Sequence, residues 1–164
     1  NDHEWHRLLR WCGEQGFDLT FIESMPMGDI GALRAGHFMP VDQVQQALQD
    51  NWQLVPSNYR SGGPARYFDV LETGRRVGFI TPYTHNFCES CNRVRVSCTG
   101  QLYLCLGQAH MVDLRQVIRE SSSSAALKSA IIEAIAMKPR GHDFDASRLE
   151  DGAQVVRFMS HTGG

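Results

Sequence analysis

Four cysteines between residues 88 and 105 constrain this chain more than any other feature. In the segment HNFCESCNRVRVSCTGQLYLCLG, Cys88 and Cys91 form a C-x2-C pair, and Cys98 and Cys105 follow at intervals of seven. One tight C-x2-C turn directs two thiolates at one metal centre, and thiolates suit zinc or an iron–sulfur cluster. The chain has five cysteines, an odd total that argues against a disulfide framework. We therefore expect a cytoplasmic protein with a cysteine metal site.

The cysteine spacing leaves three kinds of site open. A structural zinc site often uses two C-x2-C pairs, and this chain has one, so His85 or His110 would have to complete it. That alternative is a zinc-stabilised interaction domain. In a second alternative all four clustered cysteines hold one 4Fe-4S cluster, as in an electron-transfer module. In the third, three thiolates hold the cluster, and one iron stays open as a Lewis acid for a substrate nitrogen or oxygen.

The residues between the cysteines predict a β-hairpin. Two strands are expected at 93–97 and 101–105, joined by the loop 98–100 with its glycine in third place. Such a three-residue loop suits a left-handed last residue. In this register Arg93 lies opposite Cys105. A two-residue turn would instead place Cys105 on the other face, because a slip of one residue reverses every side chain.

The preferred register gives the two faces of the hairpin different characters. Arg93, Arg95 and Cys105 share one face, and Val94 and Val96 are expected to be buried on the other. Guanidinium groups offer paired donors that suit phosphate oxygens. The net charge of the chain is −2, from 16 basic and 18 acidic residues, which excludes a broadly basic nucleic-acid binder. We therefore expect an anionic ligand to be held by this local pair of arginines.

The rest of the pattern is that of an α/β protein. Helices are expected at 2–16, 41–49, 112–120 and 125–138, and strands at 17–27, 52–55, 65–72 and 75–81. The first helix and strand form the αβ step of a parallel, barrel-like sheet, in which chemistry gathers beyond the strand end, here 23–28. One of Ser121 to Ser124 is expected to cap the last helix. We place a domain boundary near residues 28–40.

Nothing in the chain predicts membrane insertion or export. No apolar run approaches the roughly 18 residues of a membrane span, and no leader pattern stands at the start. The first residue is Asn1 rather than methionine, so we expect a fragment of a longer protein.

Three segments resemble the carboxyl-terminal half of the GTP 3′,8-cyclase family: FIESMPMGDIG, GGPARYF and GFITPYTHNFCESCNRVRVSCTGQLYLCLG. Members of this family are radical S-adenosylmethionine lyases that catalyse the first step of molybdenum-cofactor biosynthesis. The resemblance implies the last helix–strand unit of an incomplete (βα) TIM-like barrel, over 1–39. A small α+β domain with an antiparallel sheet and an iron–sulfur site would follow over 40–164. It implies conversion of GTP to (8S)-3′,8-cyclo-7,8-dihydroguanosine 5′-triphosphate.

The resemblance also implies ligands for a metal cluster. Its most specific part is the C-x2-C-x13-C spacing of Cys88, Cys91 and Cys105, which in the family holds a second 4Fe-4S cluster whose open iron contacts guanine. Cys98 lies inside the motif but matches no ligand of the family, so we read it as incidental.

Further site residues follow from the resemblance alone. Arg93, Val94 and Arg95 match GTP-binding positions, with the two arginines acting through their side chains in catalysis. Met25 matches a contact to S-adenosylmethionine, and Gly163–Gly164 match a tail that reaches toward the active site.

One departure from the family limits what the chain should do alone. No C-x3-C-x2-C motif, which holds the S-adenosylmethionine-cleaving cluster, occurs in it. We therefore expect the isolated chain to be inactive and to need the amino-terminal half of the barrel as well as GTP. Cyclic pyranopterin monophosphate synthase is expected downstream, no nucleic-acid or membrane partner is expected, and a homodimer is left open.

Overall fold

The computed structural model describes residues 3–28, 38–85, 87–145, 148 and 153–162. The chain divides into two compact units. Unit 1 comprises Asn1–Met25 and Phe38–Phe87, and unit 2 comprises Pro26–His37 and Cys88–Gly164. The chain combines α-helices with antiparallel strand pairs, which confirms the predicted α/β class. The barrel remnant and the division into 1–39 and 40–164 concern a larger fold, and both stay predictions.

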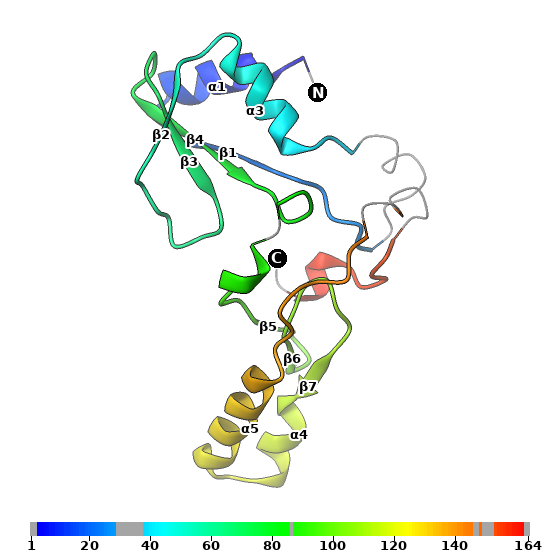
Figure 1. Ribbon diagram of the computed structural model, residues 1–164. Helices are drawn as coiled ribbons and strands as arrows, with labels where there is room; N and C mark the ends of the chain where they lie inside the picture. Colours follow the sequence, from blue (N-terminus) through cyan, green and yellow to red (C-terminus); the bar gives the residue numbers. More distant parts are fainter. Residues whose placement is uncertain (1–2, 29–37, 86, 146–147, 149–152, 163–164) are drawn as a thin grey trace. The chain divides into compact units, whose positions relative to one another are not determined.

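Unit 1 is a four-stranded sheet with two helices on one face (Figure 1). The strand order is β1-β4-β3-β2, in which β1 runs parallel to β4 and the other neighbours are antiparallel. The strands are β1 (Leu19–Ile22), β2 (Leu54–Pro56), β3 (Arg66–Val70) and β4 (Arg75–Ile80). The helices are α1 (Trp5–Glu14) and α3 (Val41–Gln49). Each of these six elements lies where the sequence predicted one, although β1 is shorter than expected.

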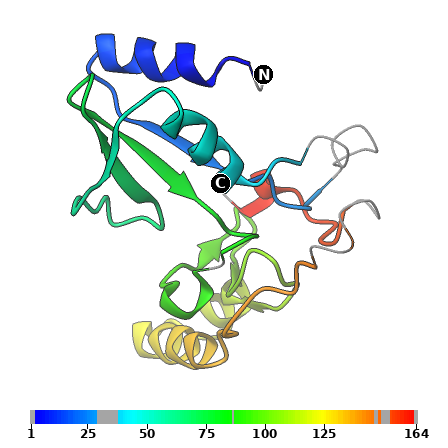
Figure 2. The same cartoon turned by 45° about the horizontal axis from the view of Figure 1, so that its top comes forward.

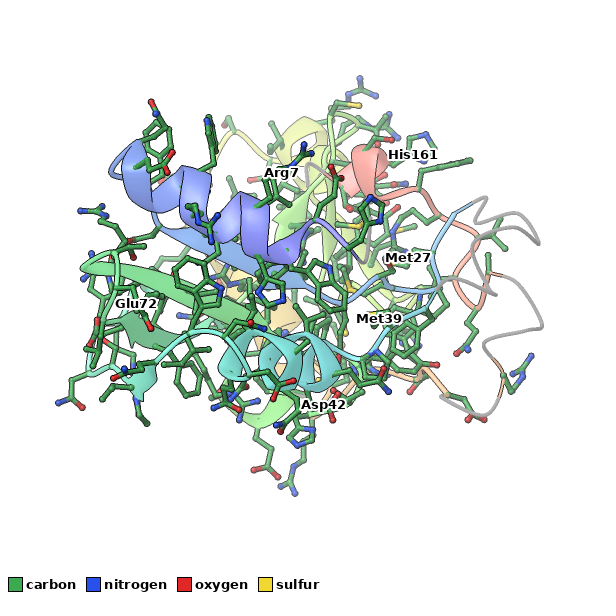
Figure 3. All side chains as sticks on the ribbon, turned by 90° about the horizontal axis from the view of Figure 1, so that it is seen from above. Arg7, Met27, Met39, Asp42, Glu72 and His161 are labelled. Atoms are coloured by element: carbon green, nitrogen blue, oxygen red, sulfur yellow. The ribbon has the colours of Figure 1, made fainter. Side chains whose placement is uncertain are left out.

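The core of unit 1 lies between this sheet and the two helices. Along β1, Leu19 and Phe21 are half-buried and alternate with the exposed Thr20 and Ile22, the period of two that a strand with one buried face shows. The buried members of the core are Leu9, Val41, Val44, Leu48, Trp52, Val70, Val77 and Phe79. Met39, labelled in Figure 3, packs against them from just before α3. This packing fixes the carboxyl end of β1, where the sequence predicted chemistry.

Unit 2 is built on a three-stranded antiparallel sheet in the order β5-β6-β7. The strands are β5 (Arg95–Val96), β6 (Gln101–Tyr103) and β7 (Met111–Asp113). Two helices, α4 (Leu114–Glu120) and α5 (Ser124–Ala136), lie side by side beneath it (Figure 2). The small core comprises Leu102, Leu104, Leu114 and Ala134. Leucines from β6 thus anchor the hairpin to the helices.

Side chains define where both helices of unit 2 begin. The Asp113 side chain accepts from the backbone N–H of Gln116 at 3.1 Å and caps α4. Ser123 accepts from the N–H of Ala125 at 3.2 Å and caps α5, which confirms the expected serine cap. In the part of the chain that the structure describes, no helix is long and apolar enough to cross a membrane.

Candidate functional site

The β5–β6 hairpin has the three-residue loop that its sequence predicts. The backbone N–H of Ser97 donates to the carbonyl of Gln101 at 2.9 Å, and the N–H of Gly100 donates back to the carbonyl of Ser97 at 3.0 Å. Gly100 has a φ of +78°, a left-handed conformation that side chains disfavour. The loop therefore consists of residues 98–100.

The pairing of the strands sets which side chains share a face. Arg95 lies opposite Tyr103, and continuing this register along both chains places Arg93 opposite Cys105. Because directly opposed residues of antiparallel strands point to the same side, Arg95 and Tyr103 share one face of the hairpin. Arg93 and Cys105 lie just beyond the paired residues, and the charges of both act on Arg95. The predicted register is confirmed. We call this face, with Arg93, Arg95, Tyr103 and Cys105, the polar face.

The opposite face departs from the prediction. Val94 and Val96 were expected to be buried, yet 37% and 56% of their surfaces are exposed. The buried residues on that side are Leu102 of β6 and Leu104, which follows β6. The reason is strand order, since β5 is the edge strand and α4 packs on β6. The prediction that the two valines form a core is therefore wrong.

The C-x2-C pair forms the expected tight turn. A single turn of 3₁₀-helix spans Cys88–Ser90, and the backbone N–H of Cys91 donates to the carbonyl of Cys88 at 3.1 Å. Cys88, Cys91 and Cys105 are all free and half-buried, whereas Cys98 is exposed at the hairpin loop. The three thiols of the predicted site therefore share an environment that Cys98 does not.

Electrostatics indicate that these three thiols are neighbours. Burial raises the pKa of the Cys105 thiol, and negative charge on Cys88 and Cys91 raises it further. A hydrogen bond from the backbone N–H of Gly107 and the positive charge of Lys138 act in the opposite direction on this pKa. A third cysteine far apart in sequence is thus brought within electrostatic reach of the C-x2-C pair.

Lys138 also closes the open end of the hairpin. Its Nζ donates to the carbonyl of Arg93 at 2.9 Å and to that of Leu104 at 2.6 Å. A cavity of about 410 Å³ beside it is lined by Cys88, Glu89, Cys91, Lys138, Pro139 and Arg140. Among the described residues, no three His, Cys, Asp or Glu side chains are placed to hold one metal ion. Of the three predicted cysteines, Cys88 and Cys91 line this cavity, and Cys105 is not among its lining residues.

Arg95 lies between the thiols and other guanidinium groups. Burial lowers its pKa most, and the positive charges of Arg93 and Arg157 lower it further. Negative charge on Cys91 and Cys105 acts in the opposite direction and raises this pKa. Two of the predicted cysteines and the predicted partner arginine thus lie near Arg95, together with Arg157, which the sequence did not predict there.

Met25 lies in unit 1, just after β1 and two residues beyond a buried carboxylate. Glu23 is 2% exposed and accepts hydrogen bonds from three backbone N–H groups and one hydroxyl. The donors are Val41 N at 3.2 Å, Tyr83 N at 2.9 Å, Thr84 N at 3.0 Å and Thr84 Oγ1 at 2.5 Å. Glu23 thus joins the strand end that carries the half-buried Met25 to the start of α3 and to the loop after β4.

The remaining predicted residues do not join the site in the described structure. His85 and His110, the candidate zinc ligands, are both exposed. Gly163 and Gly164 lie outside the described residues.

A small unit that gathers free cysteines beside arginines has the residue types of a thiolate metal centre with an anion site. The family model described as Molybdenum Cofactor Synthesis C matches residues 17–144. The chain belongs to this family.

Curated relatives carry the comparison further. The GTP 3′,8-cyclase of Paracoccus denitrificans is 53% identical over 165 residues, which cover 100% of this chain and 48% of the relative. Those of Sinorhizobium medicae and Agrobacterium fabrum are 51% and 54% identical, and the chain covers 47% of each. The resemblance to the carboxyl-terminal half of these enzymes is confirmed. The chain spans about half the length of the curated relatives it matches.

Proposed function

We propose that this chain is the carboxyl-terminal half of a GTP 3′,8-cyclase and holds a 4Fe-4S cluster and GTP. The observation that carries the proposal is that Arg95 lies within electrostatic reach of both Cys91 and Cys105. Relatives at more than half identity are named for this activity. In this reading the isolated chain lacks the S-adenosylmethionine-cleaving half and forms no product by itself.

The thiols fit a four-iron cluster. Cys88, Cys91 and Cys105 are free, half-buried and mutually close, and soft thiolate ligands suit iron–sulfur clusters. A single zinc ion needs its ligands close together, whereas each thiolate of a four-iron cluster binds a different iron. When bound by three cysteines, the cluster would supply an open iron that accepts a guanine nitrogen or oxygen. Lys138 would offset part of the negative charge of the thiolates.

The polar face would bind and orient the substrate. Arg93 and Arg95 carry positive charge beside the thiols, and guanidinium groups donate to phosphate oxygens in a fixed, two-pronged geometry. Val94 contributes by its backbone position between them. Holding the base at the cysteines and the charge at the arginines would bring C3′ and C8 of GTP together, the main contribution of this half to the rate.

The remaining assignments rest on the family. Met25 is proposed to contact S-adenosylmethionine at the end of β1, and Gly163–Gly164 to reach toward the active site. The protein is proposed to act in the cytoplasm, upstream of cyclic pyranopterin monophosphate synthase.

The test is iron content in a full-length cyclase that carries this chain as its carboxyl-terminal half. After anaerobic purification we expect Cys105→Ser to lose the iron of the second cluster, because one of three protein ligands is gone. Cys98→Ser is the matched control and should keep all of its iron, because that thiol is exposed at the hairpin loop. Loss of iron in Cys98→Ser would favour an electron-transfer module with four cysteine ligands. Zinc in place of iron in the wild-type protein would favour the interaction domain.

A further inference from the structure

Arg157 is a guanidinium that the proposed function does not yet use. It lies in the aperiodic carboxyl-terminal segment, just before the 3₁₀ turn Met159–Thr162. Nothing in its sequence context singles it out, yet it packs against the hairpin of the candidate site. Its surroundings show what it is able to bind.

The position of Arg157 is fixed by three contacts. Its Nη2 donates to the carbonyl of Leu106 at 2.8 Å and to that of Gln108 at 3.1 Å. Its guanidinium carbon lies 4.2 Å from the centre of the Tyr103 ring, within the range of a cation–π contact. Tyr103 is the cross-strand partner of Arg95, so Arg157 lies on the polar face. These contacts hold the guanidinium in place before any ligand arrives.

One donor of Arg157 is left over. Its Nε–H is buried and has no hydrogen-bond partner among the residues that the structure describes. No carboxylate forms an ion pair with it in the described part of the chain. Arg75 has a similar unpaired Nε, but its Nη2 is paired with Asp18 at 3.5 Å. An unpaired buried donor on an uncompensated cation is unfavourable unless a ligand satisfies it.

The charges around Arg157 also favour an anion. Arg93 and Arg157 both lie close enough to Arg95 for their charges to repel its own, and a bound anion would relieve that repulsion. Arg157 lines a cavity of about 420 Å³ in unit 2. Asp143 lines the same cavity, whereas Arg93 and Arg95 do not, so we expect the anion on the side of Arg157 that faces Arg95 and not in this cavity.

We propose that Arg157 is a third phosphate-binding arginine of this site and donates from Nε–H to a phosphate oxygen of GTP. The inference rests on the proposed function, because GTP is the anion in question. The triphosphate is the anionic part of GTP, so the phosphates are the groups that a cluster of cations would bind. The carboxyl-terminal segment thereby contributes to substrate binding as well as to packing.

The test compares two ligands in the cluster-loaded, full-length enzyme. We expect Arg157→Gln to weaken the affinity for GTP by about 10- to 100-fold and to leave that for guanosine unchanged, since guanosine has no phosphate. Binding is measured anaerobically by equilibrium dialysis, and iron content is measured on the same samples. Arg119→Gln is the matched control, because it removes the same charge from an exposed site on α4. It should change neither affinity.

The outcomes separate this inference from the proposed function. Unchanged GTP affinity in Arg157→Gln, or equal weakening for GTP and guanosine, overturns the role of Arg157. If Arg157→Gln loses iron, Arg157→Lys decides, because it keeps a cation that is able to reach a carbonyl. If Arg157→Lys keeps all of its iron, its affinity for GTP relative to guanosine must still be lower than that of the wild type. If both variants lose iron, Arg157 has only a structural role. A wild-type enzyme that binds no GTP would refute the proposed function itself.

Discussion

The two units each gather polar side chains, but they satisfy them differently. In unit 1, the buried Glu23 accepts four hydrogen bonds from two other segments, the start of α3 and the loop after β4. In unit 2, the free thiol of Cys105 lies beside guanidinium groups, and the Nε–H of Arg157 has no partner among the described residues. The first group is complete within the protein, whereas the second leaves one buried donor unsatisfied, as we propose, for a ligand.

This difference indicates which group carries structure and which carries chemistry. A buried carboxylate is tolerated when its oxygens are fully hydrogen-bonded, and it then fixes the segments that donate to it. A buried donor without an acceptor, such as the Nε–H of Arg157, is unfavourable unless a bound ligand satisfies it. We therefore assign Glu23 to positioning the end of β1 and the polar face to binding.

The largest expected effect is on the polar face. Arg95→Ala in the full-length enzyme should abolish cyclisation and keep the cluster, because the arginine is not a metal ligand. Each hydrogen bond from a guanidinium to a phosphate is worth about 1.5–3 kcal/mol, and the fork shape allows two. Product formation and iron content are measured on the same preparation. Normal turnover with full iron would remove Arg95 from the binding site and weaken the contrast between the units.

The next largest effect is expected at Glu23 of unit 1, whose hydrogen bonds are all made within the protein. Glu23→Leu leaves the backbone N–H groups of Val41, Tyr83 and Thr84 without their acceptor. A buried donor without an acceptor costs about 1–3 kcal/mol, and of these three residues only Val41 is fully buried. We expect a clear drop in the thermal stability of the full-length protein, with Glu23→Gln intermediate because it keeps one acceptor oxygen. Glu14→Gln, which changes an exposed carboxylate at the end of α1, should have almost no effect.

The same variants also test whether Glu23 has a structural role alone. If Glu23→Gln lowered the reaction rate without lowering stability, Glu23 would act in chemistry rather than in structure. The contrast between a structural and a functional group would then be lost.

The hairpin shows how much of the site local sequence determines. A glycine at the third loop position, between strands of matched length, was enough to predict the register that places Arg93 opposite Cys105. The C-x2-C turn followed in the same way from its spacing. Both features depend on residues near one another in the chain, and local geometry decides them.

What the sequence did not predict depends on distant segments. The exposure of Val94 and Val96 follows from strand order, which places β5 at the edge, and no period in the sequence encodes that order. Arg157 comes from a segment without period and meets the hairpin only through tertiary packing. The acceptor role of Glu23 likewise needs donors some sixty residues away in the loop after β4.

The smallest expected effect concerns the scaffold behind the polar face. Asp113 caps α4, and the hydrogen bond from the N–H of Gln116 lowers the pKa of its carboxyl group. Burial opposes this, and Arg115 adds to the lowering. A carboxyl group whose pKa is lower in the folded state than in the unfolded state stabilises the fold at pH values above its unfolded-state pKa. This stabilisation is lost as the pH falls through the folded-state pKa. At pH 7 the contribution is therefore fully present. We expect Asp113→Ala to lower thermal stability slightly and Asp113→Asn, which keeps a capping oxygen, to lower it less.

Neither Asp113 variant should change the affinity for GTP, because the cap is satisfied within unit 2 and does not belong to the polar face. Equilibrium dialysis with GTP at pH 7 checks this against the thermal melts. A weakened GTP affinity in Asp113→Asn, without a change in stability, would mean that binding extends beyond the hairpin. The part of unit 2 that binds the ligand would then include its helices. Asp113 would have to be counted with the ligand-binding groups and not with those that the protein satisfies by itself.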